Sequence, residues 1–208
     1  MGGIESAPMS STATLRRADT LADLLPLERL APLARDAALV VAGAGLTALS
    51  AQLAFTVPWT PVPYTLQTGA VLLVGTALGS VRGALSMLLY VLVGALGLPI
   101  FAEASGGAAH LIGATGGYLV GFVVAAAVVG RLAEAGWDRS FVRAAGLMLI
   151  GTTVVYAIGV PVLAIVAEIP LIVAIQQGAL VFVPWDLAKV LLAALLLPVA
   201  WRVAGYGR

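Results

Sequence analysis

The stretch Pro184-Trp-Asp-Leu-Ala-Lys189 opens a long apolar run that continues to Trp201, and it holds the only lysine of the chain. Asp186 and Lys189 are three residues apart, so on a helix they project from the same face. Ionisable groups are costly inside a membrane and are therefore candidates for a functional site. The stretch predicts a membrane-spanning helix with a charged pair near one end. The alternative is an ion pair that only sets the depth of this helix.

Composition places the rest of the chain in the membrane too. Of its 208 residues, 61% are hydrophobic and 10% are charged, whereas soluble domains have about 45–50% apolar and about 25% charged residues. The net charge of +1 gives no basis for binding nucleic acid. The absence of cysteine excludes disulfides, thiol catalysis and cysteine-ligated metals. The expected fold class is an all-α polytopic membrane protein.

Apolar runs of helix length predict six spans, at about 37–55, 66–78, 81–96, 117–132, 144–166 and 185–203. Residues 1–35 are mixed and polar, which predicts a cytoplasmic N-terminal tail before a six-helix membrane substrate-binding domain over residues 36–205. Leu171–Val183 is apolar but contains two glutamines and a glycine, so we expect a short interfacial or re-entrant helix there.

Two connecting segments have unusual compositions. Pro58, Pro61 and Pro63 forbid a helix and favour an extended loop, which is either a lid or an aromatic-anchored connector. Residues 98–118 are rich in glycine and contain the only histidine, His110. A further glycine run at positions 75, 79 and 83 predicts a tight turn between two closely packed spans.

The arginines predict the topology. With six spans, all ten arginines lie before the first span, at or after the end of the last, or in the second–third and fourth–fifth connections and the span ends that border them. By the positive-inside rule this side is cytoplasmic, as are both termini. The three connections without arginine then lie outside, together with Asp186 and Lys189, and form a cup that opens outward.

The residues available in this cup favour binding over catalysis. There is one histidine, no cysteine and no ATP-binding motif, so neither a metal centre nor nucleotide hydrolysis is expected. A carboxylate can accept N–H hydrogen bonds and an ammonium can attract an anion. A small amphiphilic solute with N–H donors and a carboxylate would fit such a pocket.

The chain resembles the BioY family, the biotin-specific substrate-binding (S) components of energy-coupling-factor transporters. The resemblance covers roughly residues 36–205. The motifs that carry it are Pro63-Tyr-Thr-Leu-Gln-Thr68, Tyr90 followed by Gly94-Ala-Leu-Gly-Leu-Pro-Ile-Phe101, Ser105-Gly-Gly107, Gly113-Ala-Thr-Gly-Gly-Tyr118 and Pro184-Trp-Asp-Leu-Ala-Lys189. Some members carry an arginine where this chain has Ser105, so the resemblance does not extend to an anion contact from that loop.

The resemblance implies biotin uptake across the inner (cytoplasmic) membrane, with no enzymatic activity and no cofactor besides the transported biotin. The implied partners are an energy-coupling transmembrane protein and ABC-type ATPases. The substrate-binding residues are expected to be Asp186, Lys189, Tyr90, Gly116, Gly117, Tyr118, Gln67 and Trp59. A small-residue stripe is expected to dock the coupling protein, and it comprises Ala38, Ala42, Ala44 and Ala48.

Biotin has ureido N–H groups and a valerate carboxylate. We hypothesise that Asp186 accepts from the first and Lys189 attracts the second, although the two roles could be exchanged or the pair could bond to itself. Three alternative functions stay open at this point. They are an S component for another vitamin, a membrane-embedded enzyme that uses Asp186 and His110 as an acid–base pair, and a purely structural subunit.

Overall fold

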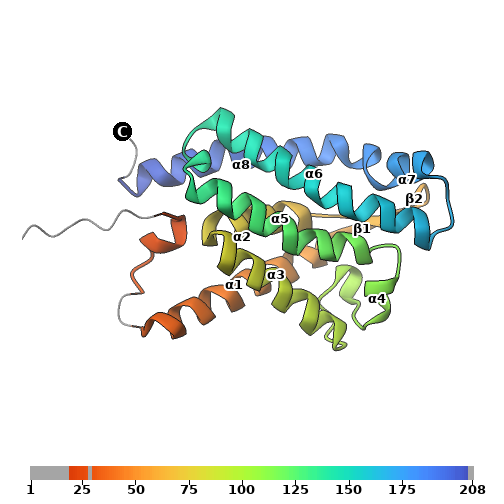
Figure 1. The fold of residues 1–208 in the computed structure, drawn as a ribbon, viewed down its shortest axis with the longest axis horizontal. Coiled ribbons are helices and arrows are strands. Elements are labelled where there is room, and N and C mark those ends of the chain that lie inside the picture. Colours follow the sequence, from red (N-terminus) through yellow and green to blue (C-terminus); the bar gives the residue numbers. More distant parts are fainter. Residues whose placement is uncertain (1–18, 28–29, 206–208) are drawn as a thin grey trace, which may run out of the picture.

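The computed structural model describes residues 19–27 and 30–205, and Figure 1 shows an elongated helical bundle. Its helices are α1 (Pro32–Gln52), α2 (Gln67–Leu78), α3 (Ser80–Ala95), α4 (Ala109–Ile112), α5 (Gly116–Glu134), α6 (Phe141–Val166), α7 (Leu171–Gly178) and α8 (Val183–Val203). Four 3-10 turns lie at Leu21–Leu24, Ala102–Ala104, Trp137–Arg139 and Leu180–Phe182. Four of the described elements are long and apolar enough to cross a membrane, namely α1, α5, α6 and the stretch Leu171–Val203, whereas α2 and α3 are apolar but shorter.

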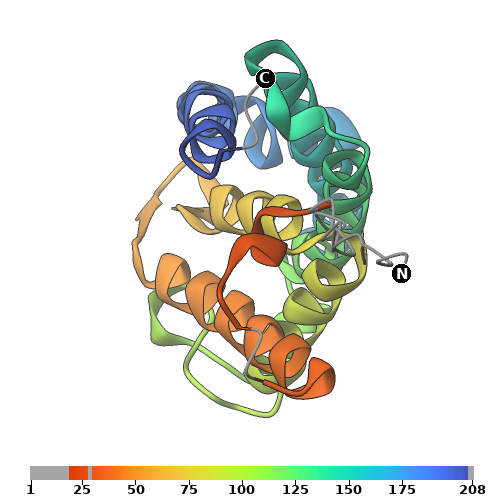
Figure 2. The ribbon, with the colours of Figure 1, turned by 90° about the vertical axis from the view of Figure 1, so that its left-hand side faces the viewer.

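The fold class needs one correction, because the chain is mostly helical but not all-α. Strands β1 (Ala54–Val57) and β2 (Thr60–Thr65) pair as an antiparallel hairpin, with Phe55 opposite Tyr64. The prolines did predict extended backbone here. Pro61 and Pro63 are two residues apart on β2, so their backbone nitrogens, which carry no hydrogen, lie on the same edge of the strand, away from β1. A strand at the edge of a sheet tolerates proline in this position. Figure 2 views the helices end-on and shows the hairpin along the side between α1 and α8.

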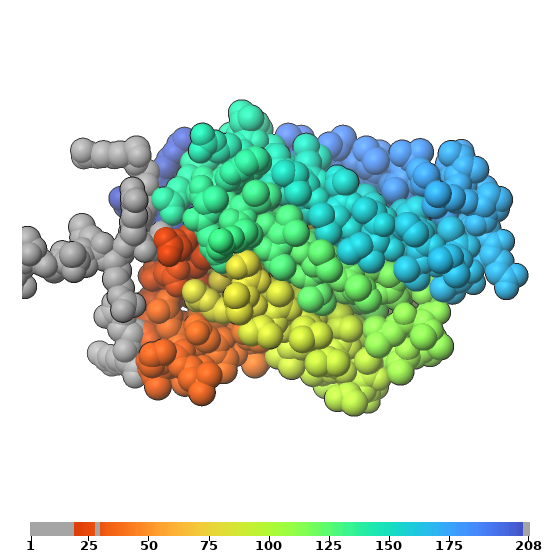
Figure 3. Space-filling model, in the orientation of Figure 1, coloured from red at the N-terminus to blue at the C-terminus, as the bar shows by residue number. Residues whose placement is uncertain are grey.

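Helix α5 is the centre of the bundle and packs against α2, α3 and α6. The space-filling view shows the side chains of α3, α5 and α6 packed against one another along one face (Figure 3). The glycines predicted to allow close packing do so. A Cβ on Gly75 would lie 2.7 Å from the carbonyl oxygen of Ala126, and a Cβ on Gly83 would lie 2.7 Å from the Cα of Gly75. The tight α2–α3 turn predicted from this run is therefore confirmed.

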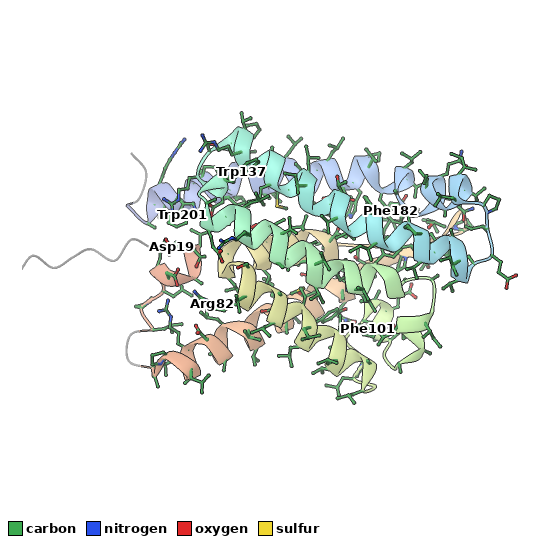
Figure 4. The ribbon with its side chains drawn as sticks, viewed as in Figure 1. Asp19, Arg82, Phe101, Trp137, Phe182 and Trp201 are labelled. Atoms are coloured by element: carbon green, nitrogen blue, oxygen red, sulfur yellow. The ribbon has the colours of Figure 1, made fainter. Side chains whose placement is uncertain are left out.

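The described arginines lie in or beside the start of α1, the start of α3, the α5–α6 connection and the end of α8, which meet at one end of the bundle (Figure 1). Figure 4 shows Arg82, Trp137 and Trp201 toward this end and Phe101 and Phe182 toward the other. Asp23, in the first 3-10 turn, accepts a hydrogen bond from Arg82 at 2.9 Å and from Arg35 at 3.4 Å. These bonds tie the segment before α1 to the α2–α3 turn. The predicted tail falls partly on residues 1–18 and 28–29, outside the described residues.

Candidate functional site

A cavity of about 400 Å³ opens at the end of the bundle opposite the arginines. Its wall is contributed by β2, the start of α2, the segment after α3, the α4–α5 connection, α6 and the start of α8. Apolar and aromatic side chains make up much of this wall, among them Phe101, Phe122 and Phe182. A pocket of this size and character suits a small organic molecule.

The polar floor of the cavity is a network of four side chains. Lys189 Nζ donates to Asp186 Oδ1 at 2.8 Å and to Thr68 Oγ1 at 2.6 Å. The hydroxyl of Thr68 lies 3.3 Å from Asp186 Oδ1, and the hydroxyl of Tyr156 donates to Asp186 Oδ2. Asp186 is 6% exposed, so these partners offset much of the cost of burying its charge. The pair predicted from the sequence therefore faces the cavity and is bonded to itself.

The local structure of α8 explains how this floor is held. Asp186 lies in the first turn of α8, where the helix dipole favours a negative charge. Trp185, beside it, donates from its indole nitrogen to the carbonyl oxygen of Thr65 at 3.1 Å, which fastens the start of α8 to β2. The short helix α7 and the turn at Leu180–Phe182 lead the chain into this position, as the sequence predicted for Leu171–Val183.

Two further predicted residues, Gln67 and Tyr118, line the cavity. Tyr90 lies behind them and is 1% exposed. The side-chain amide of Gln67 donates to the Tyr90 hydroxyl at 2.7 Å, and that hydroxyl donates to the carbonyl oxygen of Ile100 at 3.2 Å. Tyr90 therefore supports the wall of the cavity instead of forming part of it.

The remaining predicted residues do not line the cavity. A Cβ on Gly117 would lie 2.5 Å from the side chain of Val162, so this glycine serves the contact between α5 and α6. A Cβ on Gly116 would collide with the carbonyl of Leu111. Trp59 lies at the exposed tip of the hairpin, with 57% of its surface accessible. The sequence showed glycine and aromatic residues near the site but not which way they face.

The four alanines of the predicted docking stripe do not share one face of α1. Ala38 and Ala42 are exposed, Ala48 is half-buried, and Ala44 is 8% exposed within the core. Positions 42 and 44 are two residues apart, which corresponds to about 200° around a helix. Only Ala38 and Ala42 are thus available to a partner on this surface.

Sequence analysis missed two members of the polar floor, Thr68 and Tyr156. Thr68 lies next to Gln67 in a quoted motif, and its position on the first turn of α2 could have suggested a role. Tyr156 comes from the middle of α6, where no local signal distinguishes it. His110 and Asp186 both line the cavity, but no hydrogen bond joins them within the described part of the chain.

Fold and cavity together define a helical membrane protein that encloses a small-molecule site at one end of its bundle. Residues 16–206 match the model of the BioY family, and the chain belongs to this family. A biotin transporter BioY of Thermotoga maritima is 42% identical over 159 residues, which cover 76% of this chain and 87% of the relative. A biotin transporter BioY of Rhizobium etli is 36% identical over 143 residues, which cover 65% and 76%.

A solved structure has a similar fold. It is a crystal structure of the S-component for biotin from an ECF-type ABC transporter, and it superposes with a TM-score of 0.74 over 85% of this chain and 97% of that chain. Its sequence is 23% identical, so the likeness shows the shared fold. The relatives are named as transporters, and the predicted family and the prediction of a transporter component instead of an enzyme are thereby confirmed.

Proposed function

We propose that this chain is the biotin-binding S component of an energy-coupling-factor transporter and takes part in biotin uptake. The observation that carries the proposal is the polar floor of Asp186, Lys189, Thr68 and Tyr156 under an aromatic-walled cavity. This floor offers carboxylate and hydroxyl oxygens to N–H donors and an ammonium to an anion. Biotin presents both kinds of group on a compact apolar body.

The roles of the charged pair follow from the same chemistry. Asp186 accepts from the ureido N–H groups, and Lys189 attracts the valerate carboxylate. Because the two side chains are bonded to each other at 2.8 Å, the ligand has to compete with or extend this bond. Gln67 and Tyr118 contact the ligand from the wall, and Tyr90 holds Gln67 in place.

The membrane orientation rests on the arginines. We infer six spans, formed by α1, α2, α3, α5, α6 and α8. By the positive-inside rule, both termini would then lie in the cytoplasm and the cavity on the outer face of the cytoplasmic membrane. Biotin then enters from outside and is delivered to the cytoplasm by an energy-coupling transmembrane protein with ABC-type ATPases. Ala38 and Ala42, on the exposed face of α1, are the docking positions for the coupling protein.

Equilibrium binding to the purified chain tests this function. Biotin should bind far more tightly than thiamine or riboflavin, and it should elute chemically unchanged. Tighter binding of either other vitamin would assign the chain to a different substrate. Conversion of bound biotin would instead indicate an enzyme.

A further inference from the structure

The segment between Gly97 and Gly107 has the form of a closed loop over the cavity. Both glycines have positive φ angles, +104° and +107°, and open space where a Cβ would be. The backbone N–H of each glycine donates to the same acceptor, the carbonyl oxygen of Gly94, at 3.0 and 2.7 Å. Two conformationally free residues thus meet at one point, which is the geometry of a hinge. We name residues 98–106 the lid segment.

The lid segment forms part of the cavity wall through Phe101, Glu103 and Ser105. Phe101 is its apolar anchor (Figure 4) and is 3% exposed. Its ring meets Tyr90 edge-to-face at 5.4 Å and His110 at 5.6 Å. Movement of the lid segment would therefore open the cavity beside its aromatic wall.

The tip of the lid segment is held in a conformation that its residues disfavour. Glu103 and Ala104 have φ angles of +59° and +52°, in the left-handed region that residues with a Cβ seldom adopt. Such a conformation persists only where surrounding contacts impose it. The bonds inside the loop, from Phe101 N to Ser105 O and from Ser105 N to Ala102 O, flank these two residues without contacting the rest of the bundle.

Gln52, the last residue of α1, contacts the lid segment from outside, in addition to the bond from the Tyr90 hydroxyl to Ile100. Its side-chain nitrogen lies 3.0 Å from the carbonyl oxygen of Ala48 in its own helix and 3.3 and 3.2 Å from those of Ile100 and Phe101. Because the amide has two hydrogens, one can serve Ala48 while the two lid carbonyls share the other. Its side-chain oxygen accepts from the backbone N–H of Ala104 at 3.1 Å. One side-chain amide is thus hydrogen-bonded to the lid segment both before and after its tip, 48 to 52 residues away in the sequence.

We propose that Gln52 is a positioning residue that holds the lid segment closed, and that its hydrogen bonds set how fast ligand enters and leaves the cavity. Gln52 does not line the cavity, so it acts through the lid and not by contact with ligand. Because Gln52 belongs to α1, which also carries the exposed Ala38 and Ala42, the lid is joined directly to the proposed docking helix. The identity of the ligand rests on the proposed function.

Rapid-mixing kinetics of biotin with the purified chain in lipid nanodiscs test the proposal. Gln52→Ala should speed both association and dissociation by about tenfold, the effect of losing roughly one net hydrogen bond's stabilisation of the closed lid, while the Kd changes by less than about threefold. Hydrogen exchange without biotin should be faster at the amides of the lid segment, above all at Ala104. Gln52→Glu keeps the size and helix propensity of the side chain and can still accept from the N–H of Ala104, but it cannot donate to Ile100 and Phe101. It should therefore speed ligand exchange while the Ala104 amide stays protected.

Gln176→Ala is the matched control, since Gln176 is exposed on α7 and its side chain has no hydrogen bond within the described residues. This variant should exchange ligand and amide hydrogens at wild-type rates. Wild-type amide exchange in Gln52→Ala would overturn the proposal, as would a rise in dissociation alone with a matching loss of affinity. If the unaltered chain binds no biotin, the proposed function fails, and amide exchange alone still decides the role of Gln52.

Discussion

Lys189 Nζ lies 2.8 Å from Asp186 Oδ1, one helical turn away on α8, and both side chains face a cavity instead of the outer surface of the bundle. A pair at this spacing on the lipid side would only fix the depth of the helix. Because these two groups also bond to Thr68 and Tyr156 from two other helices, they form a preorganised polar floor. The following predictions test that floor and the surfaces around it.

Replacement of the ammonium should discriminate between ligands of different charge. Lys189→Ala removes the cation proposed to meet the biotin carboxylate, so biotin should bind about ten- to a hundredfold more weakly, as expected for a charged hydrogen bond. A neutral biotin ester should lose much less affinity. Competition binding measures both losses, and equal losses would contradict the assignment of Lys189 to the carboxylate.

Removal of the Tyr156 hydroxyl should weaken binding without unfolding the bundle. Tyr156→Phe leaves Asp186 Oδ2 without its donor, which misplaces the carboxylate proposed to accept from the ureido group. We expect about a tenfold loss of biotin affinity with little change in melting temperature. Unchanged affinity at an unchanged melting temperature would show that Tyr156 does not orient Asp186.

A methyl group at the α2–α3 contact should destabilise the fold. In Gly83→Ala the new Cβ lies 2.7 Å from the Cα of Gly75, backbone that cannot rotate away. Overpacking of this kind costs about 1–3 kcal/mol, and the melting temperature in detergent should fall. Gly45→Ala is the control, because Gly45 has open space around it, and its melting temperature should stay the same or rise slightly.

The contact between the N-terminal segment and α3 should depend on pH. Burial raises the pKa of the Asp23 carboxyl, but hydrogen bonds from Arg82 and Thr20 and the charge of Arg82 outweigh it and hold the pKa below 3.8. The stabilisation is therefore present above pH 3.8 and is lost as the pH falls through the lower folded-state value. Asp23→Asn should lower the melting temperature at neutral pH but not in strong acid. A difference that is constant across this range would contradict the prediction.

A large side chain on the exposed face of α1 should prevent assembly with the energy-coupling protein but leave biotin binding unchanged. Ala42→Trp should prevent co-purification with the energy-coupling protein while biotin affinity stays within about twofold of the wild-type value, because Ala42 is exposed and remote from the cavity lining. Ala200→Trp, at an exposed position of α8, should assemble normally. Normal assembly of Ala42→Trp would place the docking surface elsewhere.

Much of this architecture could be predicted because membrane helices are encoded locally. The charged pair, the short helix before α8 and the tight glycine turn followed from spacing and composition alone. The residues whose roles were predicted wrongly depend instead on how each helix is rotated about its axis and on which helix it packs against. Whether Gly117 faces ligand or α6, and whether Ala44 faces a partner or the core, is decided by helix packing that a single sequence does not display. The hairpin was missed because its prolines indicated extended backbone but not strand pairing.

The most direct test of the account is the stoichiometry of biotin bound to the purified chain, measured with radiolabelled biotin alongside Asp186→Ala. The account predicts one equivalent of biotin per chain, and a large loss of binding when the Asp186 carboxylate is removed. Absence of biotin binding by the unaltered chain, or one equivalent retained at unchanged affinity in Asp186→Ala, would contradict it.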